Sequence, residues 1–218
     1  MPTSPDGAPT SALHVEIAGS GPRLVLAHGF TQTGRLWGPF GQALGVGREL
    51  VRVDLPGHGR SSDVRADVAD SSTLLAATTG DAPCDLLGYS LGARVALHAA
   101  LARPDTVRRL VLVGGTAGID DATARAARRA RDDGLADDLE RSGEIDGFVR
   151  RWLAAPMFAG LVTPAPDERR RNTAAGLASS LRLAGTGTQE PVWHRLPGLP
   201  VPTLVLVGAV DLRFAALG

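Results

Sequence analysis

Short runs of consecutive apolar residues, each followed closely by a glycine, recur along the chain. These runs cover residues 24–27, 50–53, 85–87, 110–113 and 204–207. Because continuous apolar runs are typical of strands buried on both faces, they predict parallel strands inside a sheet. Residues 13–17 alternate apolar with polar positions instead, which predicts a half-buried strand.

Helix-like segments separate these runs, most clearly at residues 91–103. Alternation of strands and helices predicts an α/β fold, with a mostly parallel, doubly wound sheet flanked by helices. Residues 119–182 break this rhythm, since they contain helical stretches and many arginines but no strong strand. We predict that this segment is a helical lid inserted between two strands. A charged, solvated helix surface is the alternative interpretation of its arginines.

Composition restricts the chemistry. The chain has 218 residues, with 23 basic and 23 acidic side chains, one cysteine and no lysine. The length suggests one domain over residues 11–218, after a polar N-terminus at 1–10 that we expect to be disordered. The absence of lysine excludes a lysine Schiff base and a Walker-type phosphate loop. The single Cys84 excludes an intrachain disulfide and a cysteine-rich metal site.

Charge and hydropathy also bear on partners and location. Balanced charge argues against nucleic acid or an anionic membrane as a main partner. The chain has neither a recognisable secretory signal nor an apolar stretch long enough to span a bilayer. These features predict a cytoplasmic protein that acts on a small molecule.

Residues 88–92 read Gly-Tyr-Ser-Leu-Gly, a G-x-S-x-G motif between a predicted strand and a predicted helix. In that context the motif predicts a sharp, strained turn that exposes Ser90 as a nucleophile. Gly88 and Gly92 have no Cβ, so strand and helix can approach closely. The backbone N–H of Leu91 would then form part of an oxyanion hole. A chance pentapeptide in a glycine-rich chain is the alternative.

Two further motifs follow earlier strands. His28-Gly29-Phe30 comes after the run at 24–27, where the residue after the glycine would provide the second oxyanion N–H. We assign that role to Phe30 and interpret His28 as a structural turn residue. The sequence Asp-Leu-Pro-Gly-His-Gly-Arg-Ser at 54–61 follows the next strand, and we assign no chemical role to its His58.

A serine-centred triad also needs an acid and a histidine, in the order Ser, Asp, His. Asp211, directly after the last predicted strand, is the candidate acid, and an ordinary loop aspartate is the alternative. No histidine follows Asp211, and neither His98 nor His194 lies where the triad histidine is expected. We therefore expect that a final helix, strand and helix carrying the histidine are missing, and that the chain as given has little activity.

These motifs, in this order, resemble the α/β-hydrolase superfamily from about residue 13 onward. The segments at 88–94, 125–128, 151–158, 171–181 and 207–214 resemble more narrowly the 2-succinyl-6-hydroxy-2,4-cyclohexadiene-1-carboxylate synthases of menaquinone biosynthesis. The residues that this resemblance places in the substrate pocket are Tyr89, Arg94, Arg128, Trp152 and Arg171. It implies a lyase that needs no metal or organic cofactor: Ser90 removes a proton from a polycarboxylated cyclohexene, and pyruvate is eliminated.

Arginine forks bind carboxylates through paired hydrogen bonds, which suits such a substrate. We predict that Arg94, Arg128 and Arg171 converge on one cleft above Ser90, with Asp211 at the same sheet edge. The alternatives are a helix-surface salt bridge for Arg94, solvated positions for the other two arginines, and packing of the lid for Trp152. Two rival functions remain: a carboxylic ester hydrolase with an apolar pocket, and a non-catalytic binding protein of the same fold.

Overall fold

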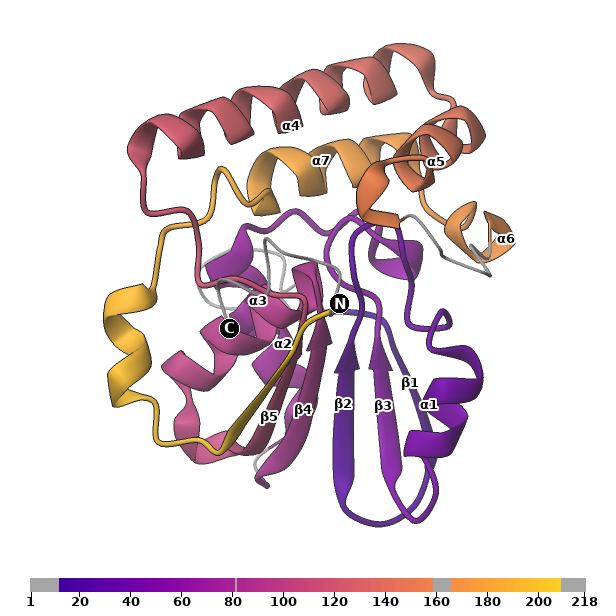
Figure 1. Cartoon of the computed structure of the whole chain (residues 1–218). Helices are drawn as coiled ribbons and strands as arrows, with labels where there is room; N and C mark the ends of the chain where they lie inside the picture. The colour runs from indigo at the N-terminus through magenta and orange to yellow at the C-terminus, as the bar shows by residue number, and fades with distance from the viewer. Residues whose placement is uncertain (1–11, 81, 159–165, 209–218) are drawn as a thin grey trace, which may run out of the picture.

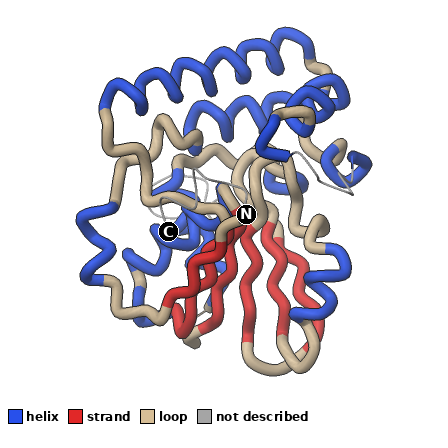
Figure 2. Tube along the Cα trace, viewed as in Figure 1, coloured by secondary structure: helices blue, strands red, loops and turns tan. Residues whose placement is uncertain are grey.

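The computed structural model describes residues 12–80, 82–158 and 166–208. Within them, six strands form one sheet in the order β1-β3-β2-β4-β5-β6 (Figures 1 and 2). The strands are β1 (Val15–Gly19), β2 (Arg23–Ala27), β3 (Glu49–Val53), β4 (Cys84–Tyr89), β5 (Val107–Val113) and β6 (Thr203–Leu206). All neighbours pair in parallel except β1 and β3. The predicted α/β sheet is therefore confirmed, whereas the N-terminus predicted to be disordered lies outside the described residues.

Helices cover both faces of this sheet because successive residues of a strand point to opposite sides. Leu24 and Leu26 of β2 pack on one side with Leu44 of α1 (Gly38–Leu44). Val25 and Ala27 pack on the other side, in the large core that also contains residues of α2 (Val68–Thr79) and α3 (Leu91–Ala102). Burial on both faces explains why the strand sequences are continuously apolar.

Between β5 and β6 the chain forms α4 (Ala122–Ser142), α5 (Ile145–Leu153), α6 (Pro166–Arg169) and α7 (Ala174–Ala184). We call these four helices the helical roof, because they lie across the carboxyl ends of the strands (Figure 1). Short 3₁₀ turns complete the described helical elements: η1 (Gly59–Ser61), η2 (Pro104–Thr106), η3 (Pro156–Phe158) and η4 (Trp193–Gly198). The described part of residues 119–182 contains no strand, as predicted.

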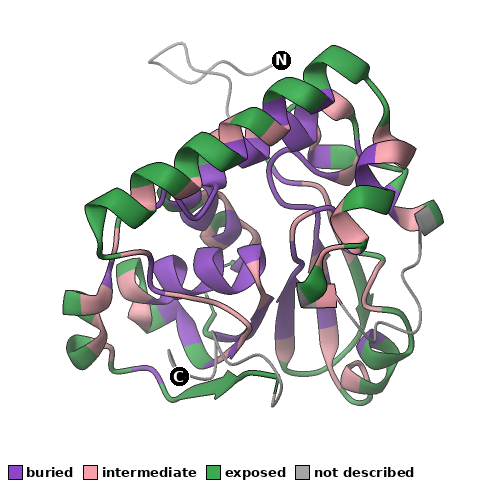
Figure 3. Cartoon of the chain, turned by 45° about the horizontal axis from the view of Figure 1, so that its top comes forward, coloured by how far each residue is buried: buried purple, intermediate pink, exposed green. Residues whose placement is uncertain are grey.

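The roof has a small core of its own. The helices α4 and α7 run side by side (Figure 1), and Leu139 of α4 packs with Phe148 of α5 and Leu177 of α7. At their outer side, Arg182 of α7 donates to the carboxylates of Asp137 and Glu140 on α4 at 2.6 and 2.8 Å. The outward face of α4 is exposed along its length (Figure 3). In the described residues, no helix combines the length and the apolar character needed to cross a membrane.

Candidate active site

Ser90 lies at the sharp turn between β4 and α3, as the sequence predicts. Its backbone is in the left-handed region, with φ 52° and ψ −106°. Its N–H donates to the Val113 carbonyl oxygen at 2.8 Å, and the N–H of Gly92 donates to the His28 carbonyl oxygen at 3.0 Å. Such strain costs about 1–3 kcal/mol and persists only where the surroundings enforce it. Here the two neighbouring strand ends enforce it.

The flanking glycines are required by close backbone contacts. A Cβ on Gly88 would lie 2.3 Å from the Gly92 carbonyl oxygen. A Cβ on Gly92 would lie 2.0 Å from the Ala27 carbonyl oxygen. Because both obstacles are backbone atoms, no side-chain rotation can relieve either clash.

A cavity of about 630 Å³ opens beside Ser90, beneath the helical roof. Ser90, Leu91 and Phe30 contribute to its lining. In the part of the chain that the structure describes, no hydrogen bond occupies the backbone N–H of Phe30 or Leu91. Phe30 and Leu91 therefore stay the predicted donors of an oxyanion hole, since an oxyanion is stabilised by N–H groups that have no other partner.

Two predicted arginines meet in this cavity. Arg94, one helical turn beyond Ser90, is buried and donates to Gln189 Oε1 at 3.2 Å. Burial lowers the pKa of Arg94 to about 10, so its guanidinium remains charged at neutral pH. Arg128 Nε, on α4, donates to both carboxylate oxygens of Asp132 at 2.9 and 3.0 Å.

The charge of the lining is unbalanced. Among the described lining residues are four arginines, at positions 94, 128, 131 and 151, and two aspartates, at 120 and 132. The excess of two positive charges in a partly desolvated cavity favours an anionic ligand.

Aromatic side chains form the wall of the cavity between the roof and the loop that carries Phe30. The ring centroid of Trp152 lies 5.0 Å from that of Phe30, edge to face, and 6.3 Å from that of Phe148, stacked. All three rings line the cavity. Trp152 therefore both packs within the roof and lines the cavity, and its contact with a substrate stays a prediction.

Comparison with known proteins agrees with this geometry. Residues 24–216 match the alpha/beta hydrolase family. The chain belongs to the alpha/beta hydrolase family. It is similar to 2-succinyl-6-hydroxy-2,4-cyclohexadiene-1-carboxylate synthases from Klebsiella pneumoniae (34% identity, 90% of this chain, 80% of the relative) and Salmonella heidelberg (33% identity, 94% and 84%). The solved structure of MenH from S. aureus superposes with a TM-score of 0.85 at 28% identity, over 94% of this chain and 83% of that one.

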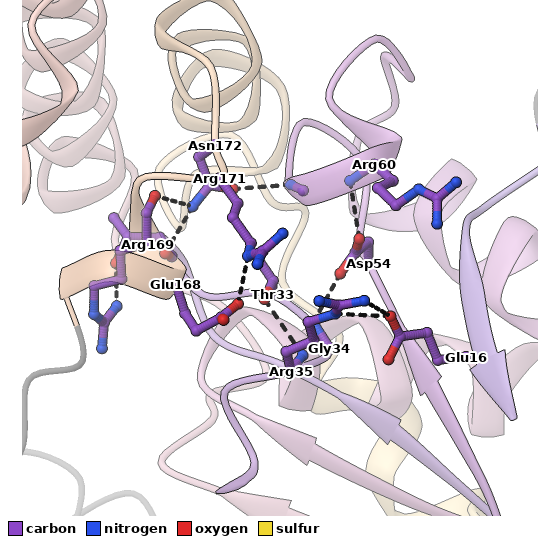
Figure 4. A network of polar contacts seen from close by, with 12 residues as sticks. Glu16, Thr33, Gly34, Arg35, Asp54, Arg60, Glu168, Arg169, Arg171 and Asn172 are labelled. Carbon is purple, nitrogen blue, oxygen red and sulfur yellow. Dashed lines mark hydrogen bonds and ion pairs between the residues drawn. The ribbon is translucent and has the colours of Figure 1, made fainter. Parts of the chain in front are cut away.

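Other predicted residues of this alpha/beta hydrolase lie elsewhere. Arg171 is half exposed, and its guanidinium pairs with the Glu168 carboxylate at 2.9 Å (Figure 4). It is not among the described lining residues, so the structure does not bring it together with Arg94 and Arg128 as predicted. The physical reason is that Arg171 follows the short α6 and meets a carboxylate three residues earlier. Tyr89 is also absent from that lining, and its ring lies against Gly29.

Arg169, which we did not single out from the sequence, is the buried arginine of that segment. Its guanidinium donates to Thr31 Oγ1, and burial lowers its pKa. Three consecutive arginines at 169–171 carry no periodic signal that distinguishes the buried one. Asp132 was missed as well, although its spacing of four residues from Arg128 on one helix could have indicated the pair.

Of the histidines in this hydrolase, His28 has a structural role, and none has been assigned as the base of the triad. His28 is buried; its Nδ1 donates to the Gly29 carbonyl oxygen at 2.8 Å and its Nε2 accepts from the Leu55 N–H at 3.0 Å. Burial lowers the pKa of His28 to about 4, which suits a neutral structural residue. None of the chain's five histidines lines the described cavity. Asp211, the predicted acid, lies outside the described residues.

Proposed function

We propose that this alpha/beta hydrolase is a carbon–oxygen lyase of menaquinone biosynthesis. It would eliminate pyruvate from a polycarboxylated cyclohexene and so form 2-succinyl-6-hydroxy-2,4-cyclohexadiene-1-carboxylate, the compound for which its relatives are named. The observation that carries the proposal is one cavity with a strained serine on one side and an excess of arginines around it. An ester hydrolase with an apolar pocket has no use for that charge.

The reaction removes one proton from the substrate, breaks one carbon–oxygen bond and returns one proton to the leaving group. Ser90 Oγ, deprotonated by a base, removes a proton from a ring carbon of the substrate. The electron pair forms the new carbon–carbon double bond, and the carbon–oxygen bond to the pyruvate-derived group breaks. The leaving group takes up a proton and is released as pyruvate. Atoms balance without water, metal or an organic cofactor.

The two unpaired N–H groups supply the electrostatic part of this mechanism. Charge that develops on a carbonyl or carboxylate oxygen of the substrate would be stabilised by the N–H donors of Phe30 and Leu91. Arg94 and Arg128 would bind the substrate's carboxylates, and Trp152 would cover its ring. Asp211 is the proposed acid of the triad.

A serine hydroxyl is a weak base until a partner removes its proton. We therefore test the proposal by a binding measurement as well as by a rate. Calorimetry with 2-succinylbenzoate, an aromatic dicarboxylate carrying the same succinyl and ring carboxylate groups, should show binding at least tenfold tighter than that of benzoate. In a coupled assay the chain should release pyruvate from the cyclohexene only slowly, because no histidine lines its described cavity, and Ser90→Ala should abolish that slow release.

The rival functions give different results. Cleavage of p-nitrophenyl acetate without pyruvate release, and without tighter binding of the dicarboxylate than of benzoate, would show that the protein is an ester hydrolase rather than a lyase. Tight dicarboxylate binding with equal background rates for the wild type and Ser90→Ala would favour a binding protein.

A further inference from the structure

Thr31, the residue after Phe30, has an unfavourable backbone conformation. Its φ of 65° lies in the left-handed region, which among the described non-glycine residues is shared only by Ser90. For a β-branched residue this conformation is a genuine outlier, so neighbouring groups must enforce it. Thr31 is fully buried, and water cannot contribute to that restraint.

Every polar group of Thr31 has a partner from a distant segment. Its N–H donates to His58 Nε2 at 3.3 Å, and its Oγ1 accepts from the Arg169 guanidinium. Its carbonyl oxygen accepts from Asn172 Nδ2 at 2.9 Å. The peptide that follows Phe30 is thus held both from the loop after β3 and from the connection between α6 and α7.

Asn172 is the residue that joins these segments (Figure 4). It is 4% exposed, and its Nδ2 donates to the carbonyl oxygens of Thr31 and Arg169, both at 2.9 Å. Its Oδ1 accepts from the Gly59 N–H at 2.9 Å. Because a carbonyl can only accept and an N–H can only donate, the amide has one orientation that satisfies all three contacts.

His58 completes the restraint and gives the motif at 54–61 a structural role. Its Nδ1 donates to the Pro56 carbonyl oxygen at 2.9 Å, which leaves Nε2 as the acceptor for Thr31. Asp54, in the same motif, accepts from the Gly34 N–H at 2.7 Å and the Arg60 N–H at 2.9 Å (Figure 4). The loops after β2 and β3 are therefore bound to one another on both sides of Thr31.

We propose that Asn172 is a positioning residue that holds Thr31 in its left-handed conformation, so that the preceding backbone presents the Phe30 N–H to the oxyanion. The proposal rests on the proposed catalytic use of that N–H, but not on the identity of the substrate. Asn172 touches no reacting atom; it acts through the carbonyl oxygen of Thr31.

The test is the variant Asn172→Ala, measured on pyruvate release and on p-nitrophenyl acetate cleavage. Loss of an oxyanion donor costs about 10²–10³ in kcat, and a misplaced donor should cost part of that. We expect kcat to fall about 10–100-fold in both reactions while KM stays within about twofold. Amide hydrogen exchange in residues 28–33 should accelerate without a matching increase elsewhere. Arg170→Ala, whose exposed ion pairs lie two residues away, is the matched control and should change neither measurement.

A second variant separates positioning from general stability. Thr31→Gly in the Asn172→Ala background allows φ near 65° without steric cost. The double variant should therefore have a kcat at least threefold higher than that of Asn172→Ala alone. Unchanged kcat and unchanged exchange in residues 28–33 would overturn the proposal, as would uniformly faster exchange with no recovery by glycine. If the wild type cleaves the ester but releases no pyruvate, the lyase proposal fails while the ester and exchange measurements still test Asn172. If it does neither, exchange alone decides.

Discussion

The two sides of the cavity are built by different means. One side, which we call the loop floor (residues 28–31, 54–61 and 88–92), is fixed by backbone hydrogen bonds, two strained residues and buried histidines. The other side, the helical roof, holds most of the charge and is stabilised by a small core and by ion pairs at its surface. The difference follows from what each side must position.

An oxyanion hole acts through backbone N–H groups, and its effect depends on placement to within a fraction of an ångström. The loop floor therefore has little freedom to move. Arginine side chains reach a carboxylate through several rotatable bonds, so small shifts of a helix are tolerated. In the proposed function, the loop floor would supply the chemistry and the roof would select the ligand.

The largest expected effect comes from adding one methyl group to each region. Gly92→Ala should prevent folding or cost more than about 4 kcal/mol, because its Cβ meets backbone oxygen and carbon of Ala27 at 2.0 and 2.4 Å. Gly134→Ala, in the middle of α4 with no atom within 4 Å of the new Cβ, should instead stabilise by about 0.5–1 kcal/mol. Thermal melts of the two variants measure both effects, and equal Tm values would contradict the contrast between the regions.

The next effect separates chemistry from binding. Ser90→Ala should lower the slow pyruvate release to the uncatalysed background, since it removes the group proposed to take the substrate's proton. Its dissociation constant for 2-succinylbenzoate should stay within about twofold, because the hydroxyl is not part of the arginine lining. Calorimetry and the coupled assay test the two halves separately. A parallel loss of binding would show that Ser90 in the loop floor also contributes to ligand binding.

A smaller effect is expected from the roof. Arg128→Gln together with Asp132→Asn removes one charge of each sign, so the net charge of the cavity lining stays the same. Binding of 2-succinylbenzoate should weaken about 10–100-fold, the loss expected for one charge-assisted hydrogen-bonded contact of about 1.5–3 kcal/mol. Arg182→Gln, on the outer side of the roof, provides the control and should bind as the wild type does. Unaltered binding in the double variant would place the ligand elsewhere.

The smallest effect is a difference in pH dependence. Burial lowers the pKa values of His28, His58 and His98 to about 4, 3 and 4. The unfolded chain therefore binds more protons below pH 6.5, and stability should fall as the pH drops from 6.5 toward 4. His98→Gln should therefore make Tm less dependent on pH between 6.5 and 4 than it is in the wild type.

The roof should respond to acid with the opposite sign. It contains no histidine between residues 122 and 184, and burial raises the pKa of Asp132, so the folded state takes up that proton more readily. Hydrogen-exchange protection, corrected for the intrinsic exchange rate at each pH, should therefore fall more in the loop floor than in the roof between pH 7 and pH 5. An equal fall of protection in both regions would contradict this expectation.

Much of the loop floor could be predicted from local sequence. The apolar runs predict the strands to within two or three residues, because burial on both faces requires continuous apolar side chains. The G-x-S-x-G motif predicts the strained Ser90, because glycines at fixed positions on either side of the serine have one common steric cause. The sequence also identifies Arg94 and Arg128 as residues that meet in one cavity, partly through the family resemblance.

Tertiary structure alone decided which arginine of 169–171 is buried and what holds Thr31. The contacts of Thr31 with Arg169 and Asn172 span 138 and 141 residues, and nothing in the neighbourhood of either segment encodes the other. Arg169, the last residue of α6, contacts Thr31 in the loop floor, whereas Arg171, two residues later, pairs with Glu168. Local sequence determines where the backbone must bend and which faces must be apolar, since those depend on adjacent residues. Which polar groups become partners depends on how distant segments pack, and that is settled only when the chain has folded.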